Sequence, residues 1–244
     1  PGTPAGTNSP SLIMKKHRFL TMTAIGAALT SPMAWAVPKV LLVGIDGVRP
    51  DEITLASTPN YDVLVAAGAY RDDALTVSFP TSSGPGWSDI LTGVGNAKHG
   101  VTGNSFPPPL HFDTYPDVLT RLEQQQPALE TVAVTDWLPF NTMISNQVDD
   151  RITLDGDTIG YGPGDAQVTQ QAVQILTNGD PDAIFVYYGN TDILAHSYGT
   201  LAPQTIAGVE TVDGYMAELI AAIQNRPTIS NEEWLVLLAT DHGR

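Results

Sequence analysis

The sequence predicts an α/β fold with a mostly parallel sheet and helices on both of its faces. Three apolar, β-branched runs each end in an aspartate, at residues 37–46, 182–192 and 233–241, and such runs are typical of buried parallel strands. Helical patterns separate the runs, and the clearest covers 203–225, where apolar residues are spaced three and four apart. Strands that alternate with helices favour a parallel sheet covered on both faces.

The remaining regular elements are predicted in chain order from similar signals. After the first strand, the stretch SSGPGWSDILTG (82–93) predicts one short helix that runs to Leu91, because Pro85 is tolerated in a first helical turn. A weaker fourth strand covers 131–137 and runs into Asp136. No repeat and no second domain is visible in this order of elements.

The middle of the chain is predicted to be irregular. The stretches 105–116 and 146–165 are rich in proline, glycine and aspartate, and we expect loops or a small cap there. His111 and Asp136 are expected to be loop residues, and His99 a structural turn residue.

Composition excludes several kinds of function. At 244 residues the chain is long enough for one α/β domain with a substantial core, and 42% of its residues are hydrophobic. Only 15% of the residues are charged and the net charge is -15, so nucleic-acid binding is not expected as the main function. The absence of cysteine removes disulfides, thiolate metal sites and cysteine nucleophiles. Any metal ion must therefore be held by oxygen and imidazole nitrogen.

Residues 14–36 have the pattern of a secretory signal peptide. The segment has a basic start, an apolar run of about a dozen residues and a small-x-small end at 34–36. That run is too short to span a bilayer, and no later run reaches about 18 apolar residues. We therefore expect a periplasmic or secreted protein without a membrane span, cleaved near Ala36. Residues 1–13 are expected to be read-through or expression-vector sequence, which leaves 37–244 for the folded domain.

Polar residues at the ends of the predicted strands are expected to meet at one edge of the sheet. In open parallel sheets the functional crevice lies at the carboxyl ends of the strands, which brings Asp46, Asp192 and Asp241 together. Asp192 and His196 are four residues apart, so a helical turn puts both on one face, and His242 follows Asp241 directly. Carboxylate oxygen with imidazole nitrogen suits zinc, with manganese and iron as alternatives. The pattern therefore predicts a metal site.

Ser83 stands where a phosphate group could bind. It immediately precedes Gly84-Pro85 at the predicted start of a helix, where free backbone amides attract phosphate oxygens. Two roles stay open for its hydroxyl from this stretch alone. It can cap the helix, or, with a cation near by, it can ionise and attack phosphorus.

The ordered set of these residues resembles the alkaline phosphatase superfamily, and within it the type I phosphodiesterase and nucleotide pyrophosphatase branch. The resemblance covers about residues 39–244, and the order of its motifs is specific although each motif alone is not. The matching positions are Gly44-Ile45-Asp46-Gly47, then Ser83 with Pro85, Thr92 and Gly93, then His99-Gly100-Val101, Asn104, Asp192 with His196, and Asp241-His242-Gly243. This register selects Ser83 as the nucleophile over Ser82 and Thr81.

The resemblance implies a two-metal hydrolase that acts on small-molecule phosphate esters. Two zinc ions about 4 Å apart are implied. Their implied ligands are Asp46, Asp241 and His242 for one ion, and Asp192 and His196 for the other. Ser83 would lie between the ions and form a covalent phosphoseryl intermediate that is then hydrolysed. Asn104 would donate a hydrogen bond to a non-bridging phosphoryl oxygen, and phosphodiester or pyrophosphate bonds would be the favoured substrates.

The nucleophile departs from the family pattern and leaves an alternative open. Diesterase members usually carry threonine where Ser83 stands, so an alkaline-phosphatase-like phosphomonoesterase is the alternative, although Asn104 favours the diesterase. A sulfatase is disfavoured because it needs an arginine where Trp87 stands. A cofactor-independent phosphoglycerate mutase does not fit a signal peptide.

The end of the chain is the second departure. Family members carry a further metal-ligating histidine well downstream of the D-H-G motif, and the chain stops one residue after Gly243. We therefore expect a C-terminally truncated domain, with the ion at Asp192 and His196 weakly held and with reduced or no activity. The missing histidine also keeps open a non-catalytic binding protein. The physiological substrate, the metal and the oligomeric state are not determined by the sequence.

Overall fold

The computed structural model describes residues 2, 36–76 and 78–243. The upstream segment and the signal peptide predicted over 1–36 lie outside the described residues, apart from Gly2 and Ala36. Within the part of the chain that is described, no helix is both long and apolar enough to cross a membrane.

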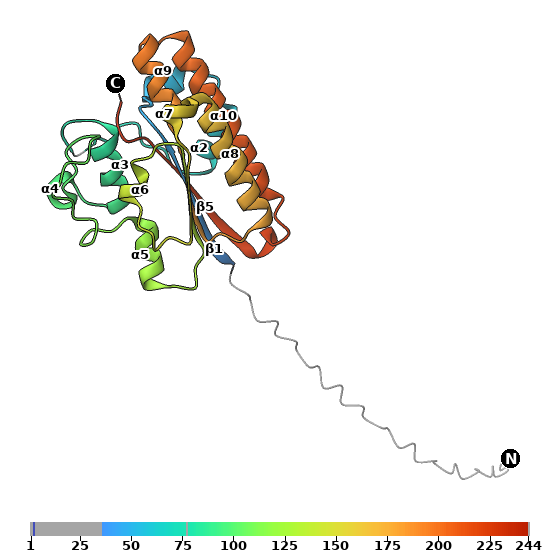
Figure 1. Cartoon of the computed structure of the whole chain (residues 1–244). Helices are drawn as coiled ribbons and strands as arrows, with labels where there is room; N and C mark the ends of the chain where they lie inside the picture. Colours follow the sequence, from blue (N-terminus) through green and yellow to red (C-terminus); the bar gives the residue numbers. More distant parts are fainter. Residues whose placement is uncertain (1, 3–35, 77, 244) are drawn as a thin grey trace. The chain divides into compact units, whose positions relative to one another are not determined.

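The described residues form a five-stranded sheet in which every strand pair is parallel (Figure 1). The strand order is β3-β2-β4-β1-β5. The strands are β1 (Val37–Ile45), β2 (Thr131–Thr135), β3 (Asp150–Thr153), β4 (Ala183–Tyr188) and β5 (Glu232–Ala239). The four apolar runs of the sequence correspond to β1, β2, β4 and β5, and the predicted α/β fold is confirmed.

Helices lie on both faces of the sheet (Figure 1). They are α1 (Pro50–Leu55), α2 (Pro59–Ala67), α3 (Ser83–Thr92), α4 (Asn96–His99), α5 (Val118–Gln125), α6 (Phe140–Met143), α7 (Gly156–Ile159), α8 (Tyr161–Asn178), α9 (Asn190–Tyr198), α10 (Pro203–Gln224) and the 3-10 turn η1 (Ile229–Asn231). The helix predicted over 203–225 is α10. The helix predicted in 82–93 is α3, which ends one residue beyond the predicted Leu91.

Two hydrophobic cores hold these layers together. On one face, α8 and α10 contribute Leu176 and Met216 to a core shared with the strands. On the other face, Trp87 of α3 and neighbouring residues of α5 and α6 form a second core with the sheet. Because side chains alternate along a strand, Tyr187 of β4 joins the second core and Tyr188 joins the first.

One predicted irregular stretch is more regular than expected. Residues 105–116 contain only turns and bends, as predicted, but 146–165 contain β3, α7 and the first turn of α8. Glycine and proline lower helix propensity, yet Gly164 permits close packing, since a Cβ there would lie 2.4 Å from Asp136 Oδ2. The prediction failed because tertiary packing of α8 against the end of β2 outweighs local propensity.

The strand β5 lies at an edge of the sheet, next to β1. Its burial alternates along the strand, and Leu235 and Leu237 are 54% and 43% exposed. The inward side chains Trp234, Val236 and Leu238 are only partly buried, so the prediction of a buried strand is wrong for β5.

Candidate functional site

The carboxyl ends of β1, β4 and β5 lie side by side and carry the predicted polar residues. Gly44 of β1 pairs with Ala239 of β5, so Asp46 and Asp241, each two residues further on, are brought to the same level. The backbone N–H of Asp46 also donates to the carbonyl of Tyr188, the last residue of β4, at 3.0 Å. The parallel register thus brings together residues that are far apart in the chain.

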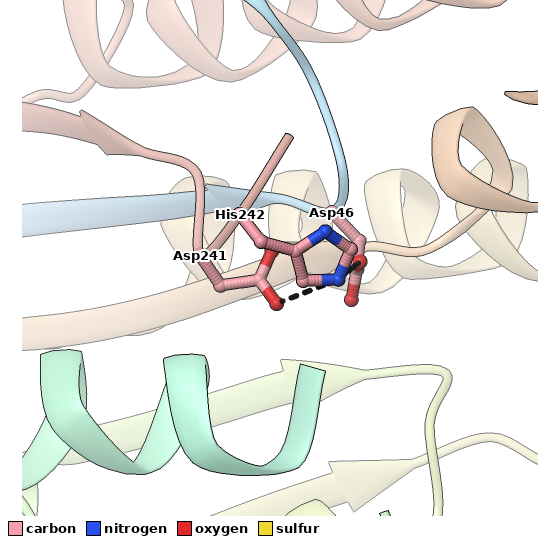
Figure 2. A group of neighbouring side chains, drawn as sticks. All are labelled: Asp46, Asp241 and His242. Atoms are coloured by element: carbon pink, nitrogen blue, oxygen red, sulfur yellow. Dashed lines mark ion pairs between the residues drawn. The ribbon is translucent and has the colours of Figure 1, made fainter. Parts of the chain in front are cut away.

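Asp46, Asp241 and His242 form a cluster that we call the strand half of the site (Figure 2). Their candidate ligand atoms lie within 4.8 Å of one another, and no other such group of three is found among the described residues. His242 Nε2 is 3.4 Å from Asp46 Oδ1 and 3.4 Å from Asp241 Oδ2, and the three side chains are at most 7% exposed. Figure 2 shows the imidazole and the two carboxylates gathered at the ends of their strands.

The electrostatics of the strand half fit a cation. Burial raises the pKa of Asp46, and burial together with the negative charge of Asp46 raises the pKa of Asp241. Asp241 Oδ2 is buried and has no hydrogen-bond partner among the described residues. A cation would neutralise the crowded carboxylates and use this oxygen, which is otherwise unsatisfied.

Asp192 and His196 form the second predicted group, which we call the helix half of the site. Both lie on α9, with His196 Nε2 3.1 Å from Asp192 Oδ2, and the His196 side chain is 50% exposed. Asp192 Oδ1 is buried without a hydrogen-bond partner among the described residues. Gly47 has φ +69°, and a Cβ there would lie 2.7 Å from Asp192 Oδ1. The helix half therefore packs directly against the residue that follows Asp46.

Ser83 is the first residue of α3, and it does not cap the helix. Ser82 occupies the N-cap position. The Ser83 hydroxyl lies instead 3.3 Å from Asp46 Oδ1 and 3.3 Å from His242 Nε2, and the residue is 7% exposed. Of the two roles left open by the sequence, the structure excludes the N-cap and places the hydroxyl against the strand half.

Asn104 lies beside the N-terminus of α3. Its Oδ1 accepts a hydrogen bond from Gly84 N at 2.7 Å, which turns the Nδ2 donor away from the helix backbone. Buried His99 holds the preceding chain, because its Nε2 contacts Asp89 Oδ1 at 2.8 Å and its Nδ1 accepts from Val101 N at 3.0 Å. These contacts agree with the structural role expected for His99.

The sequence analysis missed two residues that contact Asp46. Tyr187 donates its hydroxyl to Asp46 Oδ2 at 2.6 Å, and Trp87 donates its indole Nε1–H to the same oxygen at 2.9 Å. The sequence did contain a signal for such contacts, because the Tyr187 hydroxyl and the Trp87 indole N–H lie in elements predicted to be buried. A buried polar group of this kind usually has a hydrogen-bond partner. The identity of that partner depended on the tertiary arrangement.

Asp136, predicted as a loop residue, is fully buried where β2 ends. No donor from the described residues reaches either of its oxygens. Burial, followed by the charge of Asp165, raises the pKa of Asp136 to about 9, and burial raises the pKa of Asp165 to about 7. Asp165 Oδ1 accepts from Gly189 N at 2.9 Å, just before α9. Burial therefore favours the protonated form of both carboxyl groups.

A family model described as type I phosphodiesterase / nucleotide pyrophosphatase matches residues 40–244. That range contains both halves of the site, Ser83 and Asn104. Among curated relatives, human ectonucleotide pyrophosphatase/phosphodiesterase family member 7 is 24% identical, across 91% of this chain and 51% of the relative. The bis(5'-adenosyl)-triphosphatase of Pongo abelii is 22% identical, across 84% of this chain and 47% of the relative. The chain thus spans about half the length of the curated relatives it matches.

Two groups of solved structures resemble the fold. Murine ectonucleotide pyrophosphatase/phosphodiesterase 5, in complex with AMP, has a TM-score of 0.64 at 20% identity, across 84% of this chain and 57% of that one. A phosphonoacetate hydrolase from Sinorhizobium meliloti, in complex with phosphonoformate, has a TM-score of 0.54 at 18% identity, across 77% of this chain and 54% of that one. At these identities the likeness establishes a shared fold.

Proposed function

The chain belongs to the type I phosphodiesterase/nucleotide pyrophosphatase family, and on that premise we propose that it hydrolyses small-molecule phosphate esters at Ser83, with phosphodiester and pyrophosphate bonds favoured. The observation that carries the proposal is the position of the Ser83 hydroxyl. It lies at the start of a helix and 3.3 Å from both a carboxylate and an imidazole of the strand half. A nucleophile in this position contacts two of the candidate metal ligands directly.

Two zinc ions are the proposed cofactors, with manganese and iron as alternatives. The strand half would hold one ion and the helix half the other, because carboxylate and imidazole donors without sulfur suit these metals. Both halves contain buried donor atoms that lack a partner among the described residues. When bound, the ions would make the Ser83 hydroxyl more acidic and neutralise charge on the phosphoryl oxygens.

The proposed reaction is a displacement at phosphorus by Ser83. The Ser83 hydroxyl gives its proton to solvent and its Oγ forms a bond to phosphorus, while the bond to the leaving group breaks on the opposite side and the leaving group takes up a proton. Water then attacks the phosphoseryl intermediate, breaks its phosphorus–Oγ bond and restores the hydroxyl. Asp46 Oδ1 and His242 Nε2 lie within 3.3 Å and orient the hydroxyl. The N-terminus of α3 supplies the positive end of a helix dipole for the phosphoryl oxygens.

Asn104 supports a preference for diesters. Since Oδ1 is engaged by Gly84 N, the amide Nδ2 can donate to a non-bridging oxygen beside Ser83. A neutral donor suits a diester, which carries one negative charge, whereas a doubly charged monoester gains more from a cationic group. Serine as the nucleophile keeps a phosphomonoesterase as the second candidate.

Export is part of the proposal. The basic start, apolar run and small-x-small end of residues 14–36 support a periplasmic or secreted protein with cleavage near Ala36. N-terminal sequencing of the protein recovered outside the cytoplasm should begin close to Val37. An intact N-terminus in the cytoplasmic fraction would contradict export.

The function is tested by zinc-supplemented turnover of an aryl phosphodiester and of the matching aryl monoester. We expect diester hydrolysis at a reduced rate, because the ion of the helix half is weakly held, and its loss in Ser83→Ala. The matched control is Ser82→Ala, because Ser82 is the neighbouring N-cap residue and its hydroxyl makes no capping bond; it should retain turnover. A preference for the monoester would move the protein to the phosphatase alternative. No turnover of either ester by folded protein would contradict the proposed activity of this chain.

A further inference from the structure

The two aromatic donors on Asp46 divide its carboxylate into two different oxygens. Oδ2 accepts from Tyr187 at 2.6 Å and from Trp87 at 2.9 Å, so its donors come from β4 and from α3. Oδ1 has different neighbours, because Ser83 Oγ lies 3.3 Å from it and His242 Nε2 lies 3.4 Å from it. One oxygen is thus held by the protein core, and the other belongs to the site.

Both donors are themselves held rigidly by packing. Trp87 is fully buried and Tyr187 is 2% exposed. Their rings meet edge to face with centroids 5.4 Å apart, and Phe140 packs on Tyr187 with centroids 4.6 Å apart. Such contacts stabilise a single ring orientation, so neither donor can leave Asp46 without opening the core.

The sequence makes room for this arrangement at Gly44. A Cβ at that position would lie 2.5 Å from the Trp87 ring and 3.2 Å from the Phe185 ring, so a larger residue on β1 would displace the indole. Asp46 directly follows β1 and is two residues from Gly44, so the extended chain places both on the same side. The Trp87 indole packs on Gly44 and donates a hydrogen bond to Asp46.

The backbone of Asp46 is fixed independently of its carboxylate. Its N–H donates to Tyr188 O at 3.0 Å, and its carbonyl accepts from Thr191 Oγ1 at 2.6 Å. With the backbone held in this way, the two aromatic donors restrict the remaining side-chain torsions. The orientation of the carboxylate is therefore set by buried groups of the protein core.

We propose that Trp87 and Tyr187 are positioning residues, which hold the Asp46 carboxylate so that Oδ1 faces Ser83 and His242. The inference rests on the proposed function, because it takes Asp46 as a metal ligand and says that these two residues orient it. Hydrogen bonds from outer groups typically change metal affinity by about 10- to 100-fold when they are removed. Tyr187 and Trp87 are thus part of the site although they lie behind it.

The test compares Tyr187→Phe with Tyr188→Phe. Each variant removes one buried hydroxyl from β4 and keeps the ring, but Tyr188 bonds to Thr169 Oγ1 at 3.0 Å on the opposite face of the sheet. Zinc titration by calorimetry should show an affinity about 10-fold lower in Tyr187→Phe and an unchanged affinity in Tyr188→Phe. Urea unfolding of the metal-free proteins shows whether the two variants lose comparable stability.

A second readout does not depend on metal. The chain has four tryptophans, and nitrogen-15 labelling of their indoles gives one N–H resonance for each. The Trp87 resonance, identified by its absence in Trp87→Phe, should move in metal-free Tyr187→Phe and stay in place in Tyr188→Phe. If Trp87→Phe does not fold, Phe variants of Trp35, Trp137 and Trp234 assign the other three signals and identify the Trp87 resonance by elimination.

Three results would overturn the inference. An unmoved Trp87 resonance in Tyr187→Phe would show that the two donors do not share Asp46. Equal zinc affinity in the two tyrosine variants, or tighter binding in Tyr187→Phe, would show that the hydroxyl does not prepare a ligand. Absence of zinc binding by the parent protein would overturn the proposed metal function and the positioning role together, whereas the other two results leave the proposed function standing.

Discussion

The two halves of the site have the same kinds of donor but are assembled differently. The strand half combines the ends of β1 and β5, and its side chains are at most 7% exposed. The helix half lies on one turn of α9, and its histidine side chain is 50% exposed. The helix half forms as soon as α9 forms, whereas the strand half forms only when β1 and β5 pair in the sheet. The strand half should therefore be the more rigid part and the more sensitive to substitution.

The largest effect is expected from Asp241→Asn, which breaks the strand half. Removal of a direct ligand should weaken zinc binding by more than about 100-fold, beyond the range for outer groups, and should abolish ester hydrolysis. Because burial raises the pKa of Asp241, the neutral amide should leave the metal-free protein at least as stable. Calorimetric zinc titration and urea unfolding measure the two quantities. Asp113→Asn, at an exposed aspartate, is the control and should change neither.

Gly44→Ala tests the packing beneath the strand half. The added methyl group would lie 2.5 Å from Trp87, and we expect a loss of about 1–3 kcal/mol in the free energy of unfolding from overpacking. Gly214→Ala is a control of opposite sign, since Gly214 lies in α10 with nothing within 4 Å of an added Cβ; alanine there should stabilise the helix by up to about 1 kcal/mol. Urea denaturation followed by circular dichroism measures both. Equal effects of the two substitutions would show that the indole does not require Gly44.

Asp136→Asn removes a buried carboxyl group that lies outside both halves of the site. The pKa of Asp136 is raised to about 9 and that of its neighbour Asp165 to about 7, so the folded state binds more protons than the unfolded state above pH 4. Stability is therefore fully present at low pH and falls as the pH rises toward 9. The variant should be more stable than the parent at pH 9 by about 1–2 kcal/mol.

The same substitution should give no gain at pH 5, where both carboxyl groups keep their protons in the folded state. Urea unfolding at both pH values, without metal, makes the comparison. Zinc should leave this pH dependence in place, because Asp136 and Asp165 do not belong to the candidate ligand group. A parent protein whose stability does not change between pH 5 and pH 9 would contradict the raised pKa values.

The smallest effect on stability is expected from His196→Ala, which breaks the helix half. The side chain is half exposed, so the free energy of unfolding should change by less than about 0.5 kcal/mol. Calorimetry should show the loss of the weaker of two zinc-binding events while binding at the strand half persists. Loss of both equivalents would show that the two halves act as one cooperative site.

Much of the site could be predicted from the sequence because parallel strands present their carboxyl ends at one edge. Asp46 and Asp241 meet as expected, and the spacing of Asp192 and His196 alone places them on one helical face. The role of Ser83 could not be decided in the same way. A serine at a helix start has the same local sequence whether it caps the helix or faces a neighbouring strand end.

The failures have a common physical cause. Asp136 follows an apolar run, as Asp46 does, yet it turns into the space that Gly164 leaves open rather than toward Ser83. Tyr187 and Tyr188 are adjacent in one apolar run, but the alternation of a strand sends their hydroxyls to Asp46 and to Thr169. Such pairings depend on which elements cover each face, and a single sequence does not show them.

The sequence by itself determined the parallel α/β fold, the family, and the candidate donors, because periodicity and motif spacing are local properties of the chain. Only the tertiary structure decided that Ser83 faces the strand half, that Asp46 is held by two aromatic donors, and that Asp136 is buried beside another carboxyl group. Those outcomes depend on contacts between elements far apart in sequence. Burial and side-chain hydrogen bonding become defined only when such elements pack together.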